Sequence, residues 1–425
     1  MTKNSVLMIV AGAAMSIAAP ALAQNAGLDQ DRAYAAEMMA DASGRASLLQ
    51  GGAGGAGHDG KNFFLSDATG NNKLTIGGDA HFFYHTSFRS DNTGADNDFT
   101  HGFQNTLTRF RFGGNIWDKA LTFKIQAYLN NEGSIGLNDA WGKYTWDNNF
   151  FAQWGQFKAP LTREYLVDDN HQLAAYRSQN NNFFNQSYSQ GLMLGYTAEQ
   201  FRFMASFTDG FRTAMTGSAM NTPFNSSSEA DWALAGRVEM KFGEGEWARY
   251  NDFTSFQGSE GVGFLVGGAI GYQSFGDTGP GGADFIDWTY TIDASVEGNG
   301  WNAFAAFVGS NNDPDGPGDT SDYGAVVQGG IFVAPQWELF GRWDAIFLDN
   351  QSAGADADLH FLTFGANYYL SPESHAAKFT GQIVWSMNET MGGSRGIGLP
   401  TSSTGMLGDT DSGEINFILG GQLVF

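Results

Sequence analysis

The 425-residue sequence contains no cysteine, so the chain has no disulfide bonds and must be stabilised by hydrogen bonding and packing. Charged residues make up only 16% of the chain, against the ~25% typical of soluble globular domains. Basic residues are especially scarce: 22 Lys and Arg stand against 45 Asp and Glu, which gives a net charge of −23. That balance argues against a nucleic-acid partner, which requires a basic face.

Long apolar runs are also missing after the N-terminal segment: no later stretch approaches the ~18 apolar residues that a membrane-spanning helix needs. The N-terminus itself has the pattern of a secretory signal. Lys3 precedes an apolar or small stretch from Val6 to Ala19, and Ala21-Leu22-Ala23 forms a small-x-small cleavage site. We therefore expect residues 1–23 to be a signal peptide.

Residues 24–71 are expected to form a periplasmic leader. The alanine-rich stretch from Gln24 to Gln50 predicts a short helix, and the glycines from Gly51 to Gly60 predict a flexible linker. From residue 72 to residue 425 we expect one transmembrane β-barrel domain.

Glycine and aromatic residues are abundant, at 58 residues and 14% of the chain, which suits short strands and aromatic girdles. From Lys73 onward apolar and polar residues alternate with a period of two, as in Ile286, Trp288 and Tyr290 against Asp287 and Thr289. Sixteen such runs begin near Lys73, Gln104, Leu121, Ser134, Phe150, Gln190, Phe201, Trp232, Val262, Phe285, Trp301, Tyr323, Trp337, Phe361, Ala377 and Ile415.

The connections between these runs alternate between tight and long, as expected for short periplasmic turns and long external loops. One connection, from Phe242 to Gly261, is long where a short turn is expected. The last run ends in alternating apolar residues and a terminal Phe425, which is typical of the assembly signal of outer-membrane barrels. The sequence therefore predicts an all-β fold: an antiparallel transmembrane barrel of about 16 strands.

A charge that faces lipid at mid-depth costs about 2–4 kcal/mol, so charged strand residues should line the lumen. The predicted pore-lining basic residues are Arg109, Arg111, Lys124, Lys143, Arg202, Arg237 and Lys241. The predicted pore-lining acidic residues are Asp139, Asp287, Asp293, Glu338 and Asp344. This distribution predicts a basic wall opposite an acidic wall, which would orient dipolar solutes. The alternative is that the charges pair with one another and only keep the pore hydrated.

No cofactor is predicted. One external connection carries Asp313, Asp315 and Asp319 at a spacing similar to that of a calcium-binding loop, although two prolines and the absence of flanking helices do not fit an EF-hand. A loop calcium site and ordinary solvated turn residues both stay open there.

The stretch Gly155-Gln156-Phe157-Lys158-Ala159-Pro160 followed by Glu164 resembles a segment of the phosphate-selective porin (O and P type) family. Leu107 to Phe112, Leu137 to Trp141 and Trp337 to Arg342 are similar to the same family in order along the chain, and the leader resembles that of planctomycete members. The resemblance implies a sixteen-stranded barrel, usually a homotrimer, with one loop folded into the lumen.

In this sequence the corresponding loop runs from Lys158 to Ser189. We expect its charged residues, Lys158, Arg163, Glu164 and Arg177, to form the constriction, with the three cations on its anion-facing side. The family name implies phosphate selectivity, whereas the overall acidity of this chain departs from that pattern.

Together these observations predict a porin of the bacterial outer membrane: a water-filled channel for passive diffusion of small solutes, with an anion or phosphate preference as a finer expectation. Its partners would be outer-membrane lipid and small solutes or anions, with no nucleic acid. It is not expected to be an enzyme. The alternatives are a structural or adhesive surface barrel without an open pore, and a barrel hydrolase.

Overall fold

The fold is described from a computed structural model, which defines residues 54–60, 62–91, 98–129, 133–184, 188–210, 231–258, 261–275, 285–314, 318–349, 358–390, 405–408 and 410–425. The predicted signal peptide and leader helix lie outside these residues. Within them, no helix is long and apolar enough to cross a membrane.

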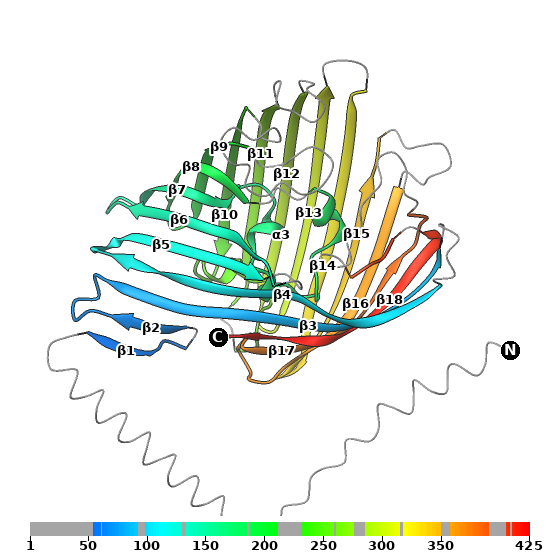
Figure 1. The fold of residues 1–425 in the computed structure, drawn as a ribbon, viewed down its shortest axis with the longest axis horizontal. Helices are drawn as coiled ribbons and strands as arrows, with labels where there is room; N and C mark the ends of the chain where they lie inside the picture. The colour runs from blue at the N-terminus through cyan, green and yellow to red at the C-terminus, as the bar shows by residue number, and fades with distance from the viewer. Residues whose placement is uncertain are drawn as a thin grey trace, which may run out of the picture. The chain divides into compact units, whose positions relative to one another are not determined.

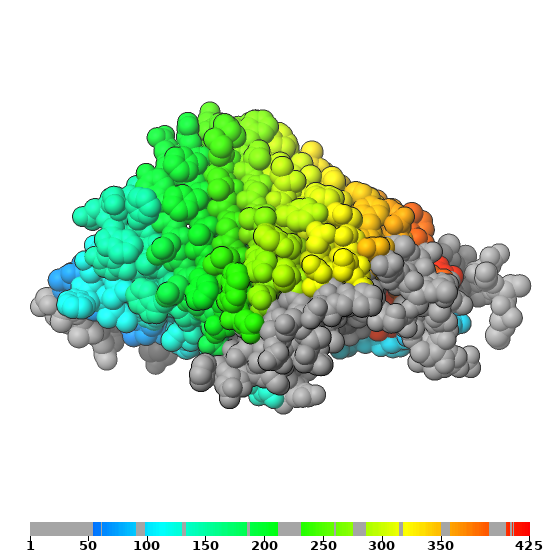
Figure 2. Space-filling model, turned by 90° about the horizontal axis from the view of Figure 1, so that it is seen from above, coloured from blue at the N-terminus to red at the C-terminus, as the bar shows by residue number. Residues whose placement is uncertain are grey.

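Sixteen antiparallel strands form one closed barrel, as the alternation predicted (Figure 1). The strands are β3 (Lys73–Asp91), β4 (Phe99–Ile116), β5 (Asp118–Leu129), β6 (Ile135–Thr145), β7 (Phe150–Lys158), β8 (Tyr188–Thr197), β9 (Phe201–Thr208), β10 (Trp232–Gly243), β11 (Gly263–Phe275), β12 (Phe285–Gly298), β13 (Trp301–Pro314), β14 (Thr320–Ala334), β15 (Trp337–Phe347), β16 (Asp358–Tyr369), β17 (Ala377–Ser386) and β18 (Thr410–Val424). Each strand pairs with the next, and β18 closes the barrel by pairing with β3. In Figure 2 the strands follow one another side by side in chain order, from cyan through green and yellow to orange.

The two faces of the wall differ as a period of two requires. Along β14, Val327, Ile331 and Val333 are more than half exposed on the outer face, whereas Gln328 on the lumenal face is buried. Large apolar side chains are exposed on the outer face of strand after strand, and most strand charges are buried on the lumenal face. An apolar exterior with charges inside is the arrangement of a lipid-embedded barrel.

Two short strands precede the barrel, β1 (Gly55–His58) and β2 (Phe63–Ser66), and β2 pairs with the start of β3. The prediction of a linker up to residue 71 was therefore wrong for these residues. β1 contains two glycines but pairs with β2, and β2 in turn pairs with Lys73–Ile76, so neighbouring strands supply the hydrogen bonds that hold both strands. The terminal Phe425 continues the β18 edge by exchanging two backbone hydrogen bonds with Gly78, 2.8 and 3.0 Å long.

Tight turns join the strands at one end of the barrel, for example at Trp146–Phe150, where Asn149 adopts a left-handed conformation with φ 65°. The connection from β7 to β8 does not extend outward from the opposite end but enters the lumen, as the resemblance implied (Figure 1). This segment, residues 159–184 as far as it is described, is called the lumen loop below. It contains α3 (Arg163–Leu166), the 3₁₀ turn η1 (Asp169–His171) and α4 (Gln179–Phe183).

The unexpectedly long connection between β10 and β11 also contacts the lumen loop. This inward segment, residues 244–258, contains the 3₁₀ turn η2 (Arg249–Asn251), and the Phe253 amide donates to the His171 carbonyl over 3.0 Å. Apolar residues of both segments pack on lumenal residues of three neighbouring strands, in a cluster of Val167, Leu173, Ala174, Phe253, Phe304, Val326 and Phe340. The lumenal face is thus not uniformly polar, because the lumen loop needs an apolar surface to pack against.

Candidate functional site

The lumen loop is attached to the wall around most of its circumference. Lumenal side chains bind its backbone: Arg237 donates to the Leu161 carbonyl, Gln422 to Asn170, Lys378 to Gln172, Asn367 to Leu173 and Arg342 to Tyr176, over 2.7–2.9 Å. These five residues come from β10, β18, β17, β16 and β15, respectively. Because each of these bonds is buried, leaving any of them unmade would cost free energy, and the loop has one well-defined position.

A buried arginine cluster attaches the first half of the loop to β4. Arg109 is 1% exposed, and its guanidinium contacts Asp79 at 3.0 Å, Asp168 at 3.0 Å and Asp169 at 2.8 Å. Arg111 contacts Asp79 at 2.8 Å and Asp168 at 3.0 Å. The two predicted pore-lining arginines are therefore brought together, but carboxylates surround them.

The electrostatics of the loop carboxylates follow from these contacts. Burial alone would raise the pKa of the Asp168 carboxyl, but the Arg109 and Arg111 guanidiniums outweigh it and hold that pKa well below its usual range. Burial would likewise raise the pKa of the Asp169 carboxyl, but the Arg177 and Arg109 guanidiniums outweigh it and hold that pKa below its usual range. Both carboxylates are therefore charged at neutral pH.

The other predicted basic residues also lie on the lumenal side with partners. Lys124 contacts Asp139 at 2.6 Å, and Lys143 lies over the Trp141 and Phe151 rings. The remaining three are in the β9–β10 region: Arg237 contacts Glu239 and Asp293, both at 2.8 Å, Arg202 pairs with Glu239, and Lys241 donates to the Gly245 carbonyl over 2.7 Å.

The predicted acidic residues are likewise engaged. Asp293 pairs with Arg237, and Asp287 accepts from the Ser310 hydroxyl over 3.0 Å. Glu338 accepts from Asn367 and Tyr369 over 2.9 and 2.7 Å, while Asp344 accepts from the Asn180 amide of the lumen loop over 3.2 Å. The contact between Arg237 and Asp293 shows that lumenal charges of opposite sign meet directly instead of standing only on opposite walls.

The four predicted constriction residues take different positions. Arg163 is 3% exposed and is enclosed by the rings of Tyr250, Phe253 and Phe304, so its guanidinium contacts protein. Glu164 accepts from the amide and hydroxyl of Ser178 over 2.6 and 2.7 Å and so holds α3 to α4. Lys158 donates to the Tyr165 carbonyl over 2.6 Å, and Arg177 pairs with Asp169.

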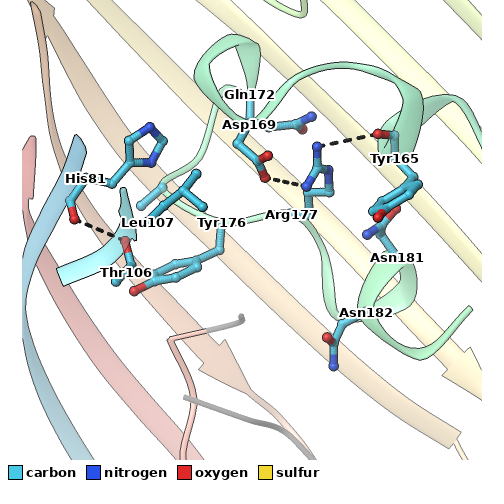
Figure 3. A pocket seen from close by; sticks show the side chains of 11 residues that line it. His81, Thr106, Leu107, Tyr165, Asp169, Gln172, Tyr176, Arg177, Asn181 and Asn182 are labelled. Carbon is cyan, nitrogen blue, oxygen red and sulfur yellow. Dashed lines mark hydrogen bonds and ion pairs between the residues drawn. The ribbon is translucent and has the colours of Figure 1, made fainter. Parts of the chain in front are cut away.

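A cavity of about 170 Å³ lies between the lumen loop and the wall formed by β3 and β4. Figure 3 shows His81, Thr106 and Leu107 on the wall side and Tyr165, Asp169, Gln172, Tyr176, Arg177, Asn181 and Asn182 on the loop side. The ion pair of Asp169 and Arg177 projects into it (Figure 3). Of the predicted constriction residues, Arg177 is the one that lines this cavity.

Sequence reasoning missed Asp79, Asp168 and Asp169 as partners of the arginines, and His81 and Tyr176 as cavity residues. Asp79 alternates correctly with its apolar neighbours, but no local pattern shows which arginine it meets across the strand pair. The excess length of the β10–β11 connection was a usable signal for the inward segment.

The three residues of the candidate calcium loop do not lie on one loop in the structure. β13 extends to Pro314, so Asp313 is a strand residue paired with Ile286, and Asp315 lies outside the described residues. Asp319 is exposed just before β14.

A closed barrel of sixteen strands, with one inserted loop and a lumen lined by charges, is the architecture of porins. No family model matches the chain, and no curated protein sequence matches it.

Solved structures do match over most of its length. The anion-selective porin from Comamonas acidovorans aligns with a TM-score of 0.58 at 13% identity, over 83% of this chain and 99% of that one. Salmonella typhi OmpF in complex with daunomycin aligns with a TM-score of 0.54 at 13% identity, over 84% of this chain and 99% of that one. The outer-membrane channel DcaP of Acinetobacter baumannii aligns with a TM-score of 0.52 at 13% identity, over 85% and 99%. At these identities the similarity establishes the fold: this chain has the porin fold.

Proposed function

We propose that this protein is a porin of the bacterial outer membrane, a passive channel for small solutes, and not an enzyme. The observation that carries the proposal is the contrast between the two faces of a closed barrel. Apolar side chains such as Phe364 and Leu419 are exposed outside, whereas charges such as Arg109 and Glu239 are buried inside. Burying charges around a lumen is costly for a purely structural barrel, and it is useful where ions or polar solutes pass.

The cavity between the lumen loop and the β3–β4 wall is the proposed narrow part of the path. Three cations stand at or behind its lining, Arg109, Arg111 and Arg177, and they are balanced by the carboxylates of Asp79, Asp168 and Asp169. A balanced constriction creates little net potential, so we propose a weak anion preference. A strong phosphate preference would require guanidiniums that are not already bonded to carboxylates.

A barrel without an open pore is the second candidate, and a specific observation favours it. The lumen loop and the inward segment together place several fully packed apolar side chains in the lumen, among them Leu161 and Leu173. A structural or adhesive protein could retain such a plug permanently. A barrel hydrolase would need a nucleophile bonded to a base in the cavity. The lining holds Thr106 and His81, but His81 Nε2 bonds to Asn170 and the Thr106 hydroxyl donates to the His81 carbonyl, so the imidazole does not activate that hydroxyl.

The deciding experiment is the current through the purified protein in a planar lipid bilayer, followed by its reversal potential under a tenfold KCl gradient. Conductance steps with a slightly anion-selective reversal potential are expected. Steps with clear cation selectivity would contradict the proposed anion preference but keep the channel. A folded barrel with no steps would refute the channel and leave the structural candidate.

A variant that lacks residues 160–184 tests the constriction. If the lumen loop narrows the path, its removal should raise the conductance of each step. Unchanged conductance in a folded barrel would place the narrow part elsewhere. We also propose a homotrimer, as the resemblance implies, and the mass of the detergent-solubilised assembly measures it directly.

A further inference from the structure

Two histidines and one aspartate from three distant parts of the chain meet at the inner side of the tight-turn end. His171 ends η1 in the lumen loop, Asp252 follows η2 in the inward segment, and His375 belongs to the connection between β16 and β17. Their potential ligand atoms all lie within 4.8 Å of one another. Among the described residues this is the one group of three such side chains close enough to share an ion.

The three side chains are held by contacts that leave their polar atoms directed toward one another. His375 Nε2 lies 2.7 Å from Asp252 Oδ2, and the His171 and His375 ring centroids are 4.8 Å apart at 55°. The His171 carbonyl accepts from the Phe253 amide, and Asp252 Oδ1 accepts from the Thr254 amide over 2.7 Å. The backbone at two of the three positions is therefore fixed before any ion binds.

The bonding of His375 is incomplete. Its side chain is 10% exposed, its Nδ1 is buried without a hydrogen-bond partner, and its ring packs edge-on against the rings of Phe256 and Tyr369. A buried polar nitrogen without a partner is unfavourable, because it has lost its bonds to water and gained none from the protein. Because one ring nitrogen of His375 is bonded and the other is unused, the ring can turn to present either nitrogen to a metal ion.

We propose that His171, Asp252 and His375 bind one divalent transition-metal ion, with zinc as the best match. Two imidazole nitrogens and a carboxylate oxygen suit zinc, whereas calcium and magnesium prefer all-oxygen sets. Tetrahedral zinc at about 2.0–2.2 Å from each donor needs donor separations of about 3.3 Å. His375 Nε2 and Asp252 Oδ2 lie 2.7 Å apart and no pair of donors is more than 4.8 Å apart, so changes of at most about 1.5 Å in these separations complete the site, and water takes the fourth position.

The bound ion would fasten the lumen loop to the inward segment and to the β16–β17 connection at a single point. The site is therefore a clamp on the element that narrows the lumen. This inference goes beyond the proposed channel and does not rest on it, because metal binding can be measured without any current.

The test uses untagged full-length protein folded in detergent, stripped with a chelator and titrated with zinc chloride in a calorimeter. About one zinc per chain is expected, with no comparable binding of calcium or magnesium. His375→Gln, His171→Gln and Asp252→Asn should each weaken zinc binding by more than the about 10–100-fold that loss of an outer-shell partner costs. His101→Gln, at an exposed histidine on β4, is the matched control and should bind as the unmodified protein does.

Absence of zinc binding, or equal binding by His375→Gln and His101→Gln, would overturn the proposal. If the three variants fail to fold, zinc-edge X-ray absorption of the unmodified protein still decides, because the site requires imidazole nitrogens at about 2.0–2.1 Å. A zinc coordination shell that contains no imidazole nitrogen would also overturn the proposal.

Discussion

Asp169 offers a direct way to change the charge balance of the cavity, and the effect can be worked out from the structure. Its carboxylate lines the cavity and contacts Arg109 and Arg177. The guanidiniums keep it ionised, since they hold its pKa below the usual range against the effect of burial. Asp169→Asn therefore removes a full negative charge and turns a balanced lining into one with a net charge of +1, while preserving the shape of the side chain.

The size of the effect follows from Coulomb's law. One added charge about 6 Å from a passing ion, in water, shifts the ion's energy by about 0.7 kcal/mol. The shift favours anions and disfavours cations, so without screening the anion-to-cation permeability ratio rises about tenfold. In about 0.1 M salt the Debye length of about 10 Å reduces this to about fourfold, and near 1 M the change should almost vanish.

The assay is the reversal potential under tenfold KCl gradients at low and at high salt. Asp147→Asn, an equal charge change in an exposed tight turn between β6 and β7, is the matched control and should leave the ratio unchanged. The barrel should stay folded, because Arg109 keeps Asp79 and Asp168. An unchanged ratio for Asp169→Asn at low salt would refute the placement of the ion path through this cavity. An equal shift at both salt concentrations would refute the electrostatic explanation.

Three further outcomes are expected. Arg163→Ala should lower the free energy of unfolding by about 3–5 kcal/mol, because it empties an aromatic cage and leaves Glu297 short of a cation, yet ion selectivity should not change. Denaturant unfolding and the same bilayer assay measure the two effects, and a selectivity shift would contradict the buried position. In lipid vesicles, Val327→Arg on the outer face of β14 should lower the free energy of unfolding by about 2–4 kcal/mol. Val333→Arg, near the end of the strand, should lower it by about 0–1 kcal/mol. Equal costs would mean that this face does not lie in a bilayer. Acid should weaken the attachment of the lumen loop. The pKa of Asp168 is lower in the folded protein than in the unfolded chain, where it is about 3.9, so the carboxylate's full contribution to stability is present above that value and is lost as the pH falls below it. The contribution of Asp168, measured as the difference in free energy of unfolding between the unmodified protein and Asp168→Asn, should therefore be constant from about pH 7 to 5 and should shrink below about pH 4.

Much of the architecture was predictable because a strand records its environment locally. A residue and its second neighbour face the same side, so Arg109 and Arg111, or Asp287 and Asp293, could be assigned to the lumen from the alternation alone. The number of strands and the alternation of tight and long connections followed from the same pattern. The strands β1 and β2 were missed because strands of four residues carry too few alternations to be recognised.

The pairing of the charges was not predictable, since it depends on which residues closure of the barrel brings opposite one another. Asp79 lies 30 positions before Arg109 and Asp168 lies 59 positions after it, yet all three meet. The sequence placed Arg163 in the constriction because it is charged and in the loop, but the fold of α3 turns it into an aromatic cage.

The sequence by itself determined that this chain forms a sixteen-stranded barrel, which side chains face outward, and which connection is unexpectedly long. Those properties depend on a two-residue period that any strand must obey. The tertiary structure decided the rest: the position of the lumen loop, the neutralisation of its arginines, and the meeting of His171, Asp252 and His375. These depend on contacts between residues up to 252 positions apart, as between Asn170 and Gln422, and only a closed barrel, with its fixed register, specifies them.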